Sequence, residues 1–289
     1  MTNDSFSIRL REARLMMGLS MDKLVERTNG AITKQSISRY EKGIMRPKRD
    51  ALQAIAKALN ISEAYFNGTN LKIDMPMLRT TSNGKLSEDE LQALEAKLSF
   101  WTEQYLAKEK EAGFPIRFKN PIKGTRVLTL EDAIQASSLL REKWHCGDGP
   151  IASILRLLER KGIMILAATL PDYVFGMSTW ADKKHPLMIL DFNPEKSSVE
   201  KLRFTAAHEL AHLLLLFPED SPLRLEKRCD LFAGFFLLPK LALIEELGSK
   251  KRAKITLEEM IDIKELYGAS LAASIIAARD YGIITTEYK

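Results

Sequence analysis

The sequence from Thr33 to Gly43 reads TKQSISRYEKG, a stretch typical of a short helix that is polar on one side. Thr33 is a good N-cap, and Ile37 and Tyr40 are expected to point into a core. The side chains left toward solvent can meet both phosphate oxygens and base edges of DNA. The predicted DNA-contacting residues are Thr33, Lys34, Gln35, Ser36, Ser38 and Arg39.

Short helices are predicted on both sides of this stretch. Over residues 7–66, apolar residues recur at spacings of three and four between turn residues, which predicts about five short helices. One of them precedes the Thr33 helix, from which a turn over residues 28–32 separates it. Arg46, Lys48 and Arg49 lie around the start of the following helix, where they could contact the phosphate backbone.

The net charge of the chain is concentrated in this first segment. Residues 1–68 contain 12 Lys and Arg against 7 Asp and Glu, whereas the remainder holds 31 of each sign. A small basic domain attached to a larger neutral one indicates a local contact with a polyanion.

Residues 7–66 resemble the lambda-repressor-like (XRE/Cro family) helix-turn-helix domain. The residues that carry the resemblance are Arg14, Gly18 to Ser20, Ile37 to Gly43, Pro47, Leu52 and Ile55 to Leu59. The resemblance implies a five-helix DNA-binding bundle over residues 1–68 that binds a double-stranded DNA operator. Because such domains usually read paired half-sites, a homodimer is expected.

Residues 69–129 are expected to join two domains. Residues 69–87 lack periodicity and contain Pro76 and the polar run TTSNGK at 80–85, which predicts a linker. A long connecting helix is predicted at about 86–112, because apolar residues form a seam along it. This seam could pack on either domain or on a second chain, and its residues are Leu91, Leu94, Leu98, Trp101 and Tyr105.

Residues 130–289 predict a mixed domain, so the chain as a whole is expected to be mainly α with a small β-sheet (α+β). Helices are predicted at about 130–144, 150–161, 198–216, 224–237, 256–266 and 270–281. Pro150 suits the first turn of the second of these helices. Short apolar runs at 162–167 and 186–192 are bounded by breakers and favour buried strands.

The stretch Phe204 to Leu215 reads FTAAHELAHLLL and contains neither proline nor glycine. Histidines four apart on a helix share one face, so His208 and His212 can bind one zinc ion. Glu209 lies beside them and is the predicted catalytic base of a zinc metallopeptidase.

A catalytic zinc site needs a third protein ligand and an open position. Glu226 and Asp230 share a face of the next predicted helix, and Glu226 is the favoured ligand. Asp230 is then expected to support a histidine by accepting a hydrogen bond from it. Cys229 is a weaker alternative ligand, because cysteine is more often a small buried residue.

The second domain resembles the ImmA/IrrE family of zinc peptidases. The matching residues are Gly149 to Ile151, Gly162-Ile163, Arg203 to Thr205, His208 to His212, Glu226, Asp230, Phe232-Ala233 and Leu237 to Pro239. The resemblance implies a zincin-like mixed domain over residues 130–289 with a gluzincin-like site. In that site His208, His212 and Glu226 hold zinc, Glu209 is the base, and the substrate is a repressor-type protein.

Two features of such a site are not identified by the motif. His185, Tyr173 and Arg203 are candidates for stabilising an oxyanion, although each is better explained as a structural or solvent-facing residue. The strand at about 187–192 could accept a substrate by edge pairing.

The composition excludes several classes of protein. With 45% apolar and 28% charged residues, the chain is expected to be globular, and its apolar runs are too short to span a membrane. No secretory signal is recognised at the N-terminus, so a cytoplasmic location is expected. Two dissimilar cysteines, Cys146 and Cys229, argue against a disulfide framework.

Two functions fit these observations. The chain could be a regulator that binds an operator and cleaves a protein, either a repressor or itself, with zinc-dependent metallo-endopeptidase chemistry. Alternatively, it could be a repressor or antitoxin whose peptidase-like domain is an inactive sensor or dimerisation module. The proposed ligands and the base are all present, which favours retained chemistry.

Overall fold

The computed structural model describes residues 5–68, 71–74, 88–113, 116–170, 172, 174–219, 221–249 and 251–285, the side chain of residue 89 excepted. Most of the predicted linker at 69–87 therefore lies outside the described residues. The chain divides into two compact units, Met1–Pro115 with Ala181–Lys183, and Ile116–Trp180 with Lys184–Lys289.

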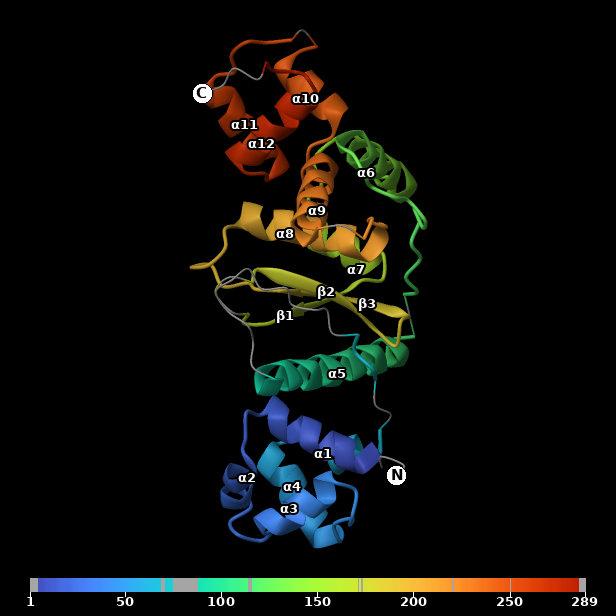
Figure 1. The fold of residues 1–289 in the computed structure, drawn as a ribbon, viewed down its shortest axis with the longest axis vertical. Helices are drawn as coiled ribbons and strands as arrows, with labels where there is room; N and C mark the ends of the chain where they lie inside the picture. The colour runs from blue at the N-terminus through green and yellow to red at the C-terminus, as the bar shows by residue number, and fades with distance from the viewer. Residues whose placement is uncertain are drawn as a thin grey trace. The chain divides into compact units, whose positions relative to one another are not determined.

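Residues 5–67 of the first unit fold into five helical elements (Figure 1). These are α1 (Ser5–Met16), α2 (Met21–Arg27), α3 (Lys34–Glu41), α4 (Arg49–Leu59) and the 3-10 helix η1 (Glu63–Asn67). Ser20 and Thr33 cap α2 and α3, since each side chain accepts a hydrogen bond from a backbone N–H of the first turn. The five predicted helical elements are confirmed, the last of them as a 3-10 helix.

A buried ion pair ties α1 to the end of α3. The Arg14 guanidinium donates to both carboxylate oxygens of Glu41, at 2.6 and 2.8 Å, and to the backbone oxygen of Leu19 at 2.8 Å. Removing one partner of such a pair leaves an uncompensated buried charge, which is strongly destabilising. The orientation of α3 is thus fixed by α1 as well as by the core residues Ile37 and Tyr40.

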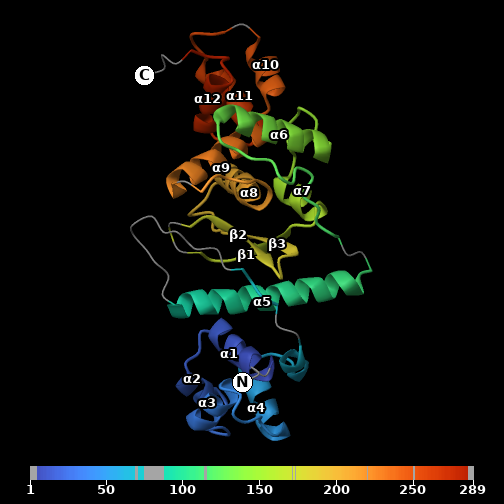
Figure 2. The same cartoon turned by 45° about the vertical axis from the view of Figure 1, so that its right-hand side comes forward.

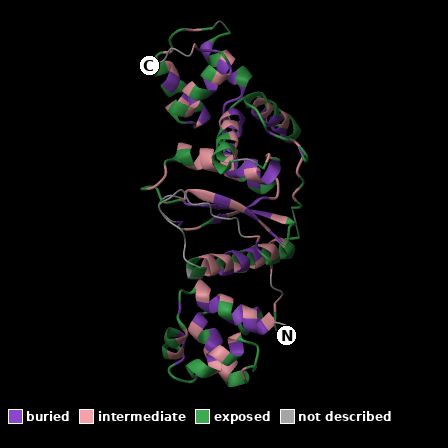
Figure 3. Ribbon diagram, viewed as in Figure 1, coloured by how far each residue is buried: buried purple, intermediate pink, exposed green. Residues whose placement is uncertain are grey.

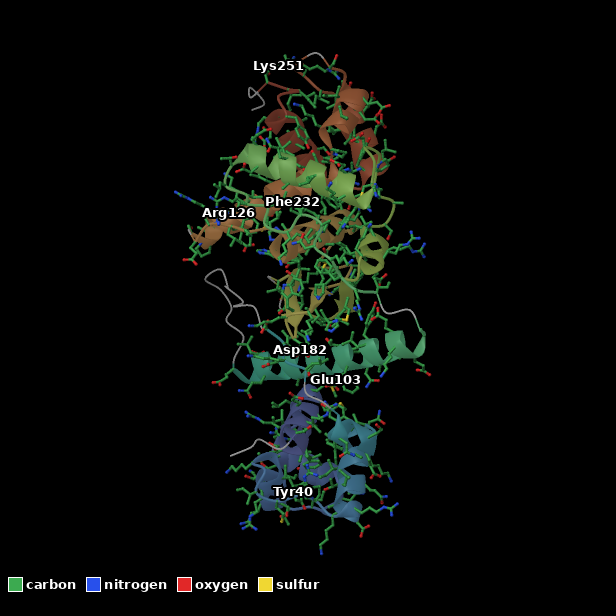
Figure 4. All side chains as sticks on the ribbon, turned by 90° about the vertical axis from the view of Figure 1, so that its right-hand side faces the viewer. Tyr40, Glu103, Arg126, Asp182, Phe232 and Lys251 are labelled. Carbon is green, nitrogen blue, oxygen red and sulfur yellow. The ribbon has the colours of Figure 1, made fainter. Side chains whose placement is uncertain are left out.

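The long helix α5 (Glu88–Glu111) packs along α1, as Figures 1 and 2 both show. Arg9 of α1 is 2% exposed and donates to both oxygens of Glu103, which is labelled on α5 in Figure 4. The Arg9 guanidinium also lies 4.1 Å from the centre of the Tyr65 ring and donates to the backbone oxygen of Tyr65. Trp101 does not belong to the packed seam, because 55% of it is exposed.

Glu12 of α1 lies near Arg9 and near two carboxylates of α5, Glu95 and Glu103. Burial raises the pKa of Glu12 to about 7, because Arg9 offsets only part of the effects of burial, Glu103 and Glu95. The folded protein therefore keeps a proton on Glu12 that the unfolded chain loses near pH 4.5. Stability is lost as the pH rises from about 4.5 to about 7, since the folded state binds more protons in that window.

The Glu12→Gln substitution should remove this loss. We expect urea unfolding to show the variant about 1 to 2 kcal/mol more stable than wild type at pH 8, a value discounted for partial solvent screening. At pH 4 the two proteins should be nearly equal, because Glu12 is then protonated in both states. An unchanged pH dependence in the variant would show that Glu12 does not carry the effect.

A three-stranded sheet lies at the centre of the second unit. Its strands are β1 (Met164–Ala167), β2 (Gly176–Ala181) and β3 (His185–Leu190), in the order β1-β3-β2. β1 runs parallel to β3, with Met164 opposite Leu187. Figure 3 colours most of β3 as buried, and Pro186 to Leu190 are buried throughout.

This topology corrects one expectation and adds a strand. The strand predicted at 186–192 is β3, but it is the central strand, so the proposed edge pairing of a substrate at residues 187–192 is wrong. β2 was not predicted; it forms an edge of the sheet. A turn over residues 182–184 joins it to β3, with Asp182 and Lys183 in the left-handed region at φ 48° and 55°.

Helices complete the second unit around the sheet. They are α6 (Leu130–Trp144), α7 (Ile154–Arg160), α8 (Val199–Leu214), α9 (Pro222–Leu237), α10 (Lys240–Leu247), α11 (Leu257–Tyr267) and α12 (Leu271–Asp280). α8 packs on β3 and against α9, and α9 packs against α6 (Figures 1 and 2). Phe232, labelled in Figure 4, is fully buried on α9.

The helices differ most from the predicted ones at the start of α7 and at α10. α7 begins at Ile154 with Ser153 as its N-cap, so Pro150 precedes the helix instead of lying in its first turn. α10 was not predicted, although Pro239 and Gly248 flank it. The predicted fold class, mainly α with a small sheet, is confirmed. None of the described helices is long and apolar enough to cross a membrane.

Two arginines of the second unit hold distant segments together. Arg141 of α6 is 4% exposed and donates to the backbone oxygens of Gly147, Gly149 and Phe236. Arg203 of α8 donates to the backbone oxygens of Ile151, Tyr267 and Gly268. Gly268 has a φ of 59°, and a Cβ there would lie 2.6 Å from Nε of Arg203, so another residue would strain the backbone and displace Arg203.

Candidate metal centre and nucleic-acid interface

α8 places His208, Glu209 and His212 of the second unit within two turns. Ser198 caps the helix, and its sequence runs without a glycine or proline to Leu214. Residues four apart lie on the same helical face, and the two imidazole rings are 5.0 Å apart between centres. Glu209 is 8% exposed, whereas the histidine side chains are partly accessible.

α9 brings Glu226 and Asp230 to these histidines. The helix begins at Pro222, a residue suited to the first helical position. Nδ1 of His208 donates to Oδ1 of Asp230 at 2.8 Å, while its Nε2 lies 3.0 Å from Oε2 of Glu226. The structure thus places Glu226 and Asp230 at opposite nitrogens of the His208 ring.

Three potential metal-binding atoms converge at this point. Nε2 of His212 lies 3.2 Å from Nε2 of His208 and 3.6 Å from Oε2 of Glu226. Ligands about 2.0 to 2.2 Å from one tetrahedral zinc ion are separated by about 3.3 to 3.6 Å. The spacing of these three atoms therefore fits a shared ion, and the half-exposed Glu226 leaves one side open to solvent.

The side chains of this cluster shift one another's pKa values strongly. Burial lowers the pKa of His208, but its hydrogen bonds to Asp230 and Glu226 outweigh burial and raise the pKa to about 10. Hydrogen bonds from His208 and His212 hold the pKa of Glu226 well below its usual value. In the absence of metal, His208 is thus a cation between two carboxylates.

Cys229 offers a competing ligand set. Among the described residues, His208, His212 and Cys229 have ligand atoms within 4.8 Å of one another. However, Sγ of Cys229 lies 3.8 Å from Nδ1 of His212, the ring nitrogen opposite the one that faces His208 and Glu226. Burial also raises the pKa of this thiol, which disfavours the thiolate. We therefore favour Glu226 as the third ligand and place Cys229 behind His212.

Glu209 has a partner that was not predicted. Oγ of Ser178, on β2, donates to Oε2 of Glu209 at 2.7 Å. The sequence carried little signal for this contact, because the strand GMSTWA lacks a clear alternation of apolar and polar residues.

The structure places the three candidates for stabilising an oxyanion in different settings. Arg203 is occupied by backbone oxygens and is structural, as its contacts with Gly268 and Tyr267 show. His185 begins β3 and does not belong to the metal-ligand group found in the described part of the chain. Tyr173 lies outside the described residues.

The candidate nucleic-acid interface is the polar side of α3. Its two core residues are buried as predicted, Ile37 at 0% and Tyr40 at 7% exposed. Of the six predicted contacts, Thr33, Lys34, Gln35 and Arg39 are exposed, and Ser36 and Ser38 are half-buried.

Several of these side chains have internal roles as well. Thr33 accepts a hydrogen bond from the backbone N–H of Ser36, and their hydroxyls are 3.0 Å apart. Nζ of Lys34 lies 2.7 Å from Asp22 of α2, with both side chains more than half exposed. Exposed pairs of this kind contribute little stability, so a phosphate can replace Asp22 as the partner of Lys34.

The loop after α3 extends this basic surface. Lys42, Arg46, Lys48 and Arg49 are all exposed between the end of α3 and the first turn of α4. Ile44, at 69% exposed, interrupts these cations with an apolar side chain. The arrangement is typical of a segment that follows a phosphate backbone.

These features define a DNA-binding regulator of the helix-turn-helix class joined to a mixed second unit. Residues 10–66 match the helix-turn-helix family. The match covers most of α1 to η1, including α3 and the basic loop after it. No curated protein matches the chain.

Proposed function

We propose that the chain is a sequence-specific transcription regulator whose second unit is a zinc-dependent endopeptidase. The observation that carries the peptidase part is the convergence of His208 Nε2, His212 Nε2 and Glu226 Oε2, with Glu209 on the same helix. The resemblance to the ImmA/IrrE family supports zinc as the metal and a repressor-type protein, or the chain itself, as the substrate.

Each residue of the cluster has a separate role in this proposal. His208, His212 and Glu226 would hold the zinc ion, which would act as a Lewis acid toward a peptide carbonyl and would make water more acidic. Asp230 fixes the ring of His208 through its Nδ1–H, as outer carboxylates do in many zinc sites. Glu209 takes a proton from the attacking water and passes it to the leaving amine.

In this proposal the helix-turn-helix domain brings the peptidase to an operator. α3 and the loop over residues 42–49 would bind a double-stranded operator, and a homodimer would allow two copies of α3 to read paired half-sites. Cleavage of a repressor would then change transcription at a site that the protein occupies.

The Glu209→Gln substitution tests the peptidase proposal. A general base contributes about 100- to 10,000-fold to rate, so peptide cleavage should nearly disappear. New protein N-termini are mapped by mass spectrometry in cells that express wild type or the variant, together with transcription from the operator. We expect a set of new N-termini and a change of transcription that both depend on Glu209.

Glu195→Gln is the matched control, because Glu195 is an exposed carboxylate of the same unit. Both variants should bind operator DNA and zinc as wild type does. If Glu209→Gln regulates transcription normally and gives the same N-termini, the peptidase proposal is wrong. The second unit would then be an inactive sensor or dimerisation module.

A further inference from the structure

Glu209 is a buried carboxylate whose orientation is set from another element. It is 8% exposed, and Oε2 accepts the hydroxyl proton of Ser178 at 2.7 Å. A buried carboxylate without a hydrogen-bond donor is costly, so this hydroxyl satisfies one of its two oxygens. The contact joins β2 to α8, and its two residues lie 31 positions apart in the chain.

Two approaches place one face of β2 against α8. Gly176, Ser178 and Trp180 alternate with the buried residues of β2 and share its other face. A Cβ on Gly176 would lie 2.6 Å from Cγ2 of Thr205, so this face of β2 closely approaches α8.

The spacing of the two elements explains why Ser178 meets Glu209. From Gly176 to Ser178 the strand advances about 6.6 Å, and from Thr205 to Glu209 the helix advances about 6.0 Å. Because these two advances are nearly equal, the approach of Gly176 to Thr205 also brings Ser178, two residues further along β2, to Glu209, four residues further along α8. The arrangement is built into the packing of two regular elements and does not depend on a loop.

We propose that Ser178 is a positioning residue that holds Oε2 of Glu209, so that the second carboxylate oxygen stays directed at the open side of the metal cluster. This inference rests on the proposed peptidase function. A glutamate side chain has several rotamers, and catalytic groups act efficiently only when one productive geometry is held. Ser178 would select that geometry without itself touching the metal or the substrate.

Binding of acetohydroxamic acid to the zinc-loaded protein tests the inference without a known substrate. This small ligand binds zinc through its oxygens and shares a proton with a neighbouring carboxylate, so its affinity reports where Glu209 points. Titration calorimetry should show about 5- to 10-fold weaker binding for Ser178→Ala, with zinc content unchanged. Ser178→Thr keeps the hydroxyl and should restore most of the affinity.

Ser197→Ala is the matched control, because the buried Ser197 hydroxyl has no hydrogen-bond partner among the described residues. This variant should bind acetohydroxamic acid as wild type does. Equal affinity of Ser178→Ala and wild type would overturn the inference. Equal losses in Ser178→Ala and Ser197→Ala would also overturn it, because the loss would then follow from any missing hydroxyl.

A measurement on the metal-free protein separates this inference from the proposed function. We compare the thermal unfolding midpoints of wild type, Ser178→Ala, Glu209→Ala and the double variant. The midpoint shift of the double variant should be smaller than the sum of the two single shifts, because both substitutions remove the same contact. Additive shifts would overturn the inference even if the protein is a peptidase. If the shifts are non-additive but the wild-type protein binds no zinc, only the peptidase proposal is rejected.

Discussion

Protein with Glu226→Ala should bind zinc at least about 100-fold more weakly than wild type, because loss of a direct ligand exceeds the 10- to 100-fold typical of outer partners. Removal of Asp230 should cost about 10- to 100-fold, since Asp230 contacts Nδ1 of His208 and not the Nε2 that faces Glu226 and His212. Cys229→Ala should change the zinc affinity least, because Sγ of Cys229 lies at Nδ1 of His212, the ring nitrogen that does not face His208 and Glu226. Competition with a chromophoric chelator measures all three.

The order of these losses decides between the two ligand sets. His208→Ala should abolish stoichiometric zinc, whereas His185→Ala, which removes a histidine outside the cluster, should retain it. If Cys229→Ala loses zinc and Glu226→Ala keeps it, the ligands are His208, His212 and Cys229. A wild-type protein without about one equivalent of zinc after preparation in zinc-containing buffer would exclude the site altogether.

Gln35→Ala and Arg39→Ala should each weaken operator binding by about 1 to 3 kcal/mol, which corresponds to about 5- to 150-fold in Kd. Both side chains are exposed on α3 beside the buried Ile37 and Tyr40. An amide can pair with adenine and a guanidinium with guanine, each through two hydrogen bonds. The measurement is a titration of operator and of random DNA at one fixed salt concentration.

Two controls separate base reading from charge. Lys57→Ala removes an exposed cation of α4 that belongs neither to α3 nor to the loop over residues 42–49, and it should leave operator affinity unchanged. Lys48→Ala should weaken operator and random DNA alike and lower the slope of log K against log salt by about 0.9 if it contacts one phosphate. Equal losses on both DNAs for Gln35→Ala and Arg39→Ala would show that these residues do not read bases.

Much of the fold could be predicted where local signals agree. α6 occupies the residues predicted, Leu130–Trp144, because Thr129 and Asp132 form a capping box at its start. The fully buried strand β3 was recognised as a short apolar run between breakers. β2 was not predicted, because its residues do not alternate clearly between apolar and polar types. Its alternating burial arises from contact with α8 and β3. Trp101 was misplaced because periodicity alone does not show which side of α5 is covered.

The candidate metal site was more predictable than its surroundings. Two histidines four apart on a helix converge through helical geometry alone, so His208 and His212 needed no tertiary information. The position of Glu226 on the next helix favoured it as the third ligand. The argument against Cys229 depends on the orientation of the His212 ring, which the sequence does not show. Ser178 was not identified because a serine in a strand carries no signal of the carboxylate that it meets.

The arginine contacts of the second unit have a consequence for synthesis on the ribosome. Arg203 bonds to a backbone oxygen 65 residues further on, and Arg141 to one 95 residues further on, whereas Arg14 and Glu41 are 27 residues apart. Contacts between residues far apart in sequence form late, and N-terminal domains fold first as the chain emerges. α1 to η1 can therefore fold early, and Arg9 gains its contact once Glu103 has emerged, while α8 gains its full support only after Gly268 has emerged. We expect a newly made chain to bind DNA before it can hold zinc, so cleavage would begin only after the regulator can reach its operator.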